Sequence, residues 1–78
     1  MGFEVHCRFP LDGERDWEVI DAAVRRVAMC RSDRSGTDGR WREHVWLIGY
    51  FGDAVRLKDR LNSIESVEAT VRERLTEI

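Results

Sequence analysis

The sequence predicts an α+β fold in which two helices cover one face of a β-sheet. Three observations support this prediction. Apolar and polar side chains alternate near both ends of the chain, as they do in half-buried strands. Two stretches between these ends carry apolar side chains at helical spacing. A central run rich in aromatic and β-branched residues separates the two helical stretches and is typical of a buried strand.

The first half of the chain is predicted to form a strand followed by a helix. Residues 3–9 alternate without error, and Pro10 ends the strand. Residues 14–30 place their apolar side chains on one helical stripe, namely Trp17, Ile20, Ala23, Val24, Val27 and Ala28. Residues 31–40 contain no aliphatic side chain, so we expect a loop or hairpin end there, with at most a short polar edge strand.

The second half is predicted to form a strand, a helix and a last strand. Residues 41–51 are the most β-prone stretch and carry apolar side chains on both faces. Asp53 is a candidate N-cap for a helix over residues 54–64, and residues 66–75 alternate again. The resulting β-α-β-β-α-β order is that of a ferredoxin-like sandwich, with its second strand short or missing. Right-handed crossovers would place the first strand beside the third and parallel to it.

The chain of 78 residues (9.1 kDa) is expected to be one domain, residues 1–78. It contains no apolar run of the roughly 20 residues needed to cross a bilayer, and its first residues lack the apolar region of a secretory signal. The two cysteines, Cys7 and Cys30, are expected to be free thiols in a reducing compartment. The sequence therefore predicts a cytoplasmic location and no contact with a membrane.

The sequence shows no pattern typical of a metal site, a cofactor site or an enzyme. The soft ligands are His6, Cys7, Cys30 and His44, and neither C-x-x-C nor H-x-x-x-H spacing is present. Cys7 has the apolar parity of the first strand, away from the accessible setting that a nucleophilic thiol needs. Gly36 and Gly39 precede a strand instead of a helix, which is the wrong context for a phosphate-binding loop. We therefore expect a protein without catalytic activity, metal or cofactor.

The central strand has two faces of different character. One parity carries Arg42, His44, Trp46, Ile48 and Tyr50, and the other carries Glu43, Val45, Leu47, Gly49 and Phe51. Because small aliphatic side chains suit the helix-covered side, we expect Trp46, Ile48 and Tyr50 on the open face, beside His6 and Arg8 of the first strand. Such an apolar patch with a polar rim is typical of a binding site. The alternative is that a terminal segment or residues 31–40 cover Trp46 and Tyr50.

One part of the chain resembles RNA-recognition motif domains. The run HVWLIGYF followed by DAVRLKDRLN resembles their third strand and second helix, over about a quarter of the chain. The resemblance implies that aromatic side chains of the sheet face stack on bases. The first strand departs from the family, because it carries Glu4, His6 and Arg8 where a stacking aromatic is expected, and the Gly-aromatic-Gly part of the motif is absent.

Two groups of charged residues are further candidate contact surfaces. Glu14, Glu18 and Asp21 form an acidic ridge on the first helix, which is either a solvated face or a docking surface for a basic partner. Four arginines around residues 31–42 form a basic pole that would contact an acidic protein or a phosphate backbone, namely Arg31, Arg34, Arg40 and Arg42.

These observations favour a non-catalytic protein-binding module, a small regulator or inhibitor that docks on a larger protein or nucleoprotein complex. Phage-encoded inhibitors such as anti-CRISPR proteins have this size and acidity. The alternative is a single-stranded nucleic-acid binder that uses His6, Trp46 and Tyr50 for stacking and the arginines for phosphates. The formal net charge of -2 favours protein over nucleic acid as partner. Edge-to-edge homodimerisation is a third hypothesis.

Overall fold

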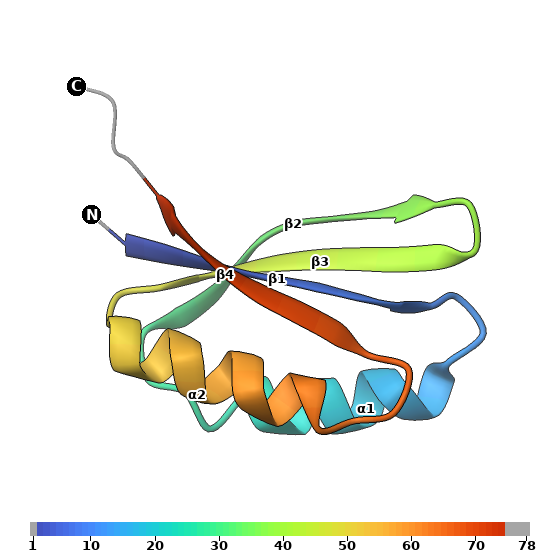
Figure 1. Ribbon diagram of the computed structural model, residues 1–78, viewed down its shortest axis with the longest axis horizontal. Coiled ribbons are helices and arrows are strands. Elements are labelled where there is room, and N and C mark those ends of the chain that lie inside the picture. The colour runs from blue at the N-terminus through green and yellow to red at the C-terminus, as the bar shows by residue number, and fades with distance from the viewer. Residues whose placement is uncertain (1, 75–78) are drawn as a thin grey trace.

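The structure, a computed structural model, describes residues 2–74 of the chain (Figure 1). Within these residues it contains four strands and two helices, which are β1 (Gly2–Pro10), α1 (Glu14–Val24), β2 (Cys30–Asp38), β3 (Trp41–Ile48), α2 (Phe51–Asn62) and β4 (Glu68–Arg74). The predicted α+β class is confirmed, and the arrangement is compatible with a ferredoxin-like fold.

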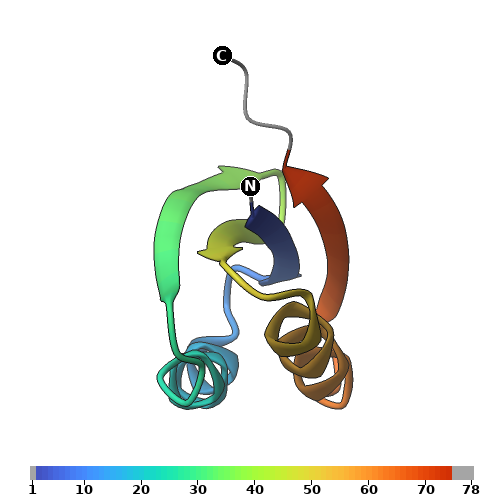
Figure 2. The same ribbon diagram turned by 90° about the vertical axis from the view of Figure 1, so that its left-hand side faces the viewer.

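The strands form one antiparallel sheet in the order β2-β3-β1-β4. Both helices lie on the same side of this sheet, as the end-on view in Figure 2 shows. The first strand lies beside the third, as predicted, but the two run antiparallel, so the predicted parallel pairing is wrong. The reason is the tight turn after β2, where Gly39 has a φ of +62°. This turn makes β3 antiparallel to β2, and because β2 runs in the same direction as β1, β3 lies between them and is antiparallel to both.

The prediction that the second strand is short or missing is also wrong. β2 spans nine residues, the same length as β1, and pairs with β3 over its whole length. All of its residues after Cys30 are exposed. An edge strand of this kind is held by backbone hydrogen bonds to one neighbour and needs no apolar side chains, so the absence of aliphatic residues did not indicate a loop.

The two helices differ from the predicted ones at their ends. α1 ends at Val24 instead of residue 30, because Arg26 and Val27 donate to the carbonyl groups three residues before them, and Met29 has a left-handed φ of 60°. α2 begins at Phe51 with Tyr50 in the N-cap position. Asp53 is therefore not the N-cap, but lies in the first turn, where a carboxylate suits the helix dipole. β4 lies inside the predicted 66–75 range, whose last residue is outside the described residues.

One apolar core fills the space between the sheet and the helices. The alternation of β1 is confirmed, because Val5, Cys7 and Phe9 are buried beneath the helices. α1 contributes Ile20 and Ala23 to this core, and α2 contributes one apolar stripe, formed by Ala54, Leu57 and Leu61. The face of the sheet opposite the helices is called the open face below.

Candidate binding surface

The orientation of β3 is opposite to the predicted one. Trp46 and Ile48 lie on the helix-covered face with 3% and 1% of their surface exposed, so they cannot belong to an open aromatic patch. The register fixes this orientation, because Trp46 lies directly opposite the buried Val5 of β1. The larger side chains go under the helices because an indole buries more apolar area than a valine. Neither a terminal segment nor residues 31–40 are needed to cover Trp46.

Four aromatic rings form a row between α1 and the helix-covered face of the sheet. Phe9 stacks on Trp17 with ring centroids 5.9 Å apart, Trp17 lies 5.5 Å from His44, and His44 stacks on Trp46 at 4.4 Å. Burial lowers the pKa of His44, so its imidazole is neutral at pH 7. These contacts join α1 to the sheet.

His44 also shares a hydrogen bond with the hydroxyl of Ser32, through Nε2. A serine beside a histidine is the beginning of a nucleophilic pair, which needs a third group to orient the imidazole. Within residues 2–74 no hydrogen bond to His44 Nδ1 is formed, and no group of three or more His, Cys, Asp or Glu side chains is arranged to hold a metal. We therefore assign the Ser32–His44 contact to the packing of the ring row.

The open face carries charged and polar side chains in rows that run across the strands. In the register, Glu68 of β4, Arg8 of β1 and Glu43 of β3 form one row. The next row toward the start of β1 contains Thr70, His6, Val45 and Arg34, and the row after it contains Arg72, Glu4, Leu47 and Arg31. His6 and Arg8 are thus on the open face, as predicted.

An ion-pair network joins the two edge strands over the open face. Arg74 of β4 donates to Asp33 of β2 at 3.3 Å, and Arg34 donates to the same carboxylate at 2.7 Å. Glu4 of β1 accepts a 2.7 Å hydrogen bond from His6 and lies 3.5 Å from Arg34 and 3.9 Å from Arg74. Asp33 is the extra residue of the β-bulge between Ser32 and Arg34, and a bulge of this kind bends the strand that contains it.

The network shifts the titration of its two carboxyl groups. The hydrogen bond from His6 lowers the pKa of Glu4, against the opposite effect of burial, and Arg34 and Arg74 lower it further. Burial raises the pKa of Asp33, but the hydrogen bonds from Arg74 and Arg34 outweigh it and the net direction is downward. Both groups are therefore ionised at neutral pH, so the carboxylates of the network are charged there.

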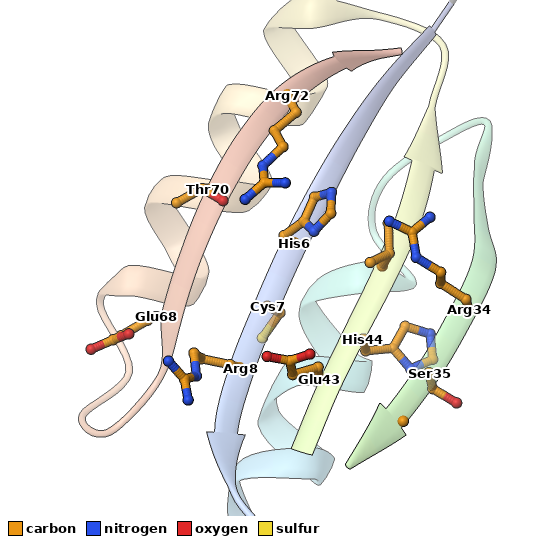
Figure 3. Close-up of a pocket in the computed structure, with 12 residues that line it drawn as sticks. His6, Cys7, Arg8, Arg34, Ser35, Glu43, His44, Glu68, Thr70 and Arg72 are labelled. Atoms are coloured by element: carbon orange, nitrogen blue, oxygen red, sulfur yellow. The ribbon is translucent and has the colours of Figure 1, made fainter. Parts of the chain in front are cut away.

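Beyond the network the open face is hollowed into a trough of about 610 Å³, and Figure 3 shows the side chains around it. The residues that line it include His6, Arg8, Arg34, Glu43, Glu68 and Arg72. The guanidinium of Arg8 lies 4.5 Å from the ring centroid of Trp41, an arrangement typical of a cation–π contact. Its Nε is buried and has no hydrogen-bond partner within residues 2–74.

A second exposed surface lies at the end of the sheet where β3 passes into α2 (Figure 1). Met29, Tyr50 and Phe51 are 73%, 63% and 57% exposed, more than any other large apolar side chain of the described residues. Cys30 pairs with Ile48, so the residue before it, Met29, lies beside Gly49, the residue after Ile48. Phe51 packs on Phe3 with ring centroids 5.2 Å apart. We call Met29, Tyr50 and Phe51 the end patch. Tyr50 is thus exposed, as predicted, but at the N-cap of α2 and not on the sheet.

The charged residues predicted to form two surfaces are distributed as follows. Glu14 and Glu18 of α1 are exposed, and Asp21 forms a 3.0 Å ion pair with Arg25. The four arginines are all exposed, but they do not form one pole. Arg31 and Arg34 lie on β2 with open-face register, Arg40 lies in the turn, and Arg42 lies opposite Phe9 on the helix-covered side of β3.

Several residues of these surfaces were missed by the sequence analysis, namely Asp33, Glu43, Glu68, Arg72 and Arg74 of the open face and Met29 and Phe51 of the end patch. The position of Arg72 on the open face could be predicted from the alternation of residues 66–75, because Arg72 has the parity opposite to that of the apolar Ala69. Asp33 had no signal, because a β-bulge in a polar strand leaves no pattern. Met29 and Phe51 had been assigned to a helix end and a strand end, so their exposure was not predictable.

The free edge of β4 is occupied at one position by a side chain of α2. The amide of Asn62 donates to the carbonyl of Ala69 at 3.0 Å and accepts from its N–H at 2.8 Å. Both backbone groups of Ala69 therefore point away from β1 and are already paired.

Comparisons with protein-family models, with curated proteins and with solved structures found no match to this chain. Neither helix of the described residues is long and apolar enough to span a bilayer. The function is therefore argued from the surfaces alone.

Proposed function

We propose that this protein is a non-catalytic binding module, a small regulator or inhibitor that docks on a larger protein through the end patch. The observation that carries the proposal is the clustering of the three most exposed large apolar side chains, Met29, Tyr50 and Phe51, at one end of the molecule. Aromatic side chains and methionine are enriched in the buried centres of protein interfaces. The proposal takes the fold as ferredoxin-like and the location as cytoplasmic, where Cys7 and Cys30 stay reduced.

The backbone supports a fixed end patch. Tyr50 occupies the N-cap position of α2, and the ring of Phe51 packs on Phe3, so both residues stand at an ordered helix start. A ring that is already held by packing, as that of Phe51 is, loses little conformational entropy on binding. The geometry favours protein over nucleic acid as the partner, because Trp46, the central ring of the alternative stacking surface, is buried.

Site-specific photo-crosslinking tests this proposal without knowledge of the partner. A benzophenone amino acid replaces Tyr50 in one variant and Val19, a 51% exposed residue of α1, in a matched control. After irradiation in extract of the source cell, with and without nuclease, we expect a discrete larger protein attached to position 50 and not to position 19. Equal labelling at both positions contradicts the proposal, and adducts that disappear with nuclease favour the nucleic-acid alternative.

Alanine substitution measures the contribution of the patch. Once the crosslinked partner is identified, the double variant Tyr50→Ala, Phe51→Ala should weaken its binding by about 30-fold or more, since anchor residues cost at least about 2 kcal/mol when truncated. Val19→Ala should leave the affinity unchanged. Unchanged affinity of the double variant would reject the end patch as the docking surface.

A further inference from the structure

We infer that the trough on the open face binds an extended segment of the partner protein that carries an acidic side chain and, two to four residues along, a basic one. This inference rests on the proposed function, because it supplies a second contact of the same partner.

The two ends of the trough carry opposite charges. Along the strands, Arg72 of β4 stands at one end, and Glu68 and Glu43 stand at the other end on either side of Arg8. The side chain of Arg34 reaches from the middle row toward His6 (Figure 3). The floor between these ends is formed by the row of Thr70, His6 and Val45. The trough is therefore polarised along the strand direction.

Several of these charges have no ion partner among the residues that the structure describes. Within residues 2–74, Arg72, Glu43 and Glu68 form no ion pair, although Arg34 is bound to Asp33 and Glu4. Arg8 lies between Glu43 and Glu68 in the register, yet its guanidinium lies over Trp41 and its buried Nε is unpaired. A buried donor without a partner costs free energy, so a ligand acceptor at this point would be favourable.

The charge pattern discriminates between classes of ligand. A nucleic-acid backbone along the trough would be repelled by Glu43 and Glu68, and a polybasic segment would be repelled by Arg34 and Arg72. A segment of mixed charge satisfies both ends.

The spacing sets the separation of the two charges in the segment. Neighbouring rows of the sheet are about 7 Å apart, and Arg72 and Glu68 lie two rows, or about 13 Å, apart. An extended segment covers these distances with two to four residues. The trough volume of about 610 Å³ lies in the usual range of ligand sites, about 300–1,000 Å³.

Backbone-amide NMR titration with three blocked pentapeptides tests the inference. The mixed peptide is Asp-Ser-Thr-Ser-Lys, and the comparison peptides carry Asp at both ends or Lys at both ends. We expect the mixed peptide to bind more tightly than either comparison peptide, by up to about fivefold, since an added ion pair contributes up to about 1 kcal/mol. The largest amide shifts should fall on His6, Val45 and Thr70.

A charge-reversal variant makes the test specific for the trough. The double variant Glu43→Arg, Glu68→Arg removes both acidic groups from exposed positions. It should reverse the preference, so that the peptide with two Asp residues binds more tightly than the mixed one, by up to about fivefold. The matched control Glu14→Arg, Glu18→Arg changes the net charge equally on α1 and should keep the wild-type preference.

Three outcomes would overturn the inference. The first is equal binding of the mixed and single-sign peptides, and the second is a set of shifts outside the trough. The third is a control variant that changes the preference as much as the trough variant does. An oligothymidylate of about eight nucleotides that shifts the trough amides more than any peptide would assign the face to nucleic acid.

The two experiments separate the trough from the end patch. If the peptides fail while crosslinking at position 50 succeeds, only the trough is rejected. If crosslinking fails while the titration is positive, only the end patch is rejected.

Discussion

The two faces of the sheet are stabilised by different interactions. On the helix-covered face, Trp46 belongs to a row of stacked rings and to the apolar core. On the open face, Asp33, Glu4 and Arg74 form charged contacts that join the two edge strands. Burial of apolar area contributes several kcal/mol for each large side chain, whereas exposed ion pairs contribute roughly 1 kcal/mol or less. The stability of the molecule therefore comes mainly from the helix-covered face.

The largest effect is expected where the two faces are compared directly. Trp46→Ala should lower the free energy of unfolding by about 3–5 kcal/mol, because it removes a buried indole and leaves a cavity. Trp41→Ala, on the open face, should cost about 1 kcal/mol, the value of a partly exposed cation–π contact. Urea unfolding followed by circular dichroism measures both. A Trp46 variant that no longer unfolds cooperatively agrees with the prediction, and equal losses for the two variants would contradict it.

A smaller effect is expected from the titration of His44. Burial lowers the pKa of this imidazole, so the folded state binds fewer protons than the unfolded state, whose histidine titrates at about pH 6.5. The stability from this group is complete above that pH and decreases as the pH falls toward the folded pKa. His44→Phe keeps a ring in the stack and should remove this slope. The measurement is the urea midpoint of both proteins at pH 7.5 and pH 5.5, and parallel decreases would exclude His44 as the cause.

The smallest effect is expected on the open face, from Asp33→Asn. The pKa of Asp33 is lowered in the folded state, so its stabilisation is present above its ordinary pKa and decreases as the pH falls through the folded value. The variant should be slightly less stable than the wild type at pH 7, and this difference should shrink in high salt and at low pH. The measurement is the thermal midpoint of both proteins in low and in high salt, at pH 7 and at acidic pH. A difference that persists in acid would assign Asp33 a role other than ion pairing.

The sequence was sufficient to orient β1 in the sheet and insufficient to orient β3. β1 was predicted correctly, with its buried parity, because it alternates without ambiguity at Val5, Cys7 and Phe9. β3 carries apolar side chains on both parities, so its alternation does not decide which side faces the helices. Only the register against β1 decides it, and register is a long-range property.

The candidate site was predicted in part for the same reason. His6 and Arg8 were placed on the open face because they follow from β1 alone. The trough requires Arg34 of β2 and Arg72 of β4 in addition, two residues 38 positions apart in the sequence that only the sheet order brings to the same trough. The bulge at Asp33 determines how β2 bends, and no local pattern in a polar strand encodes it.

The side chain of Asn62 has a consequence for how the molecule meets others. A sheet with two free edges can grow sideways by adding strands from other chains, which leads to aggregates. Here Asn62 occupies the outer backbone groups of Ala69 on β4, and the bulge after Ser32 interrupts the ladder along β2. Lateral growth by strand addition is thus hindered at one point on each border of the sheet.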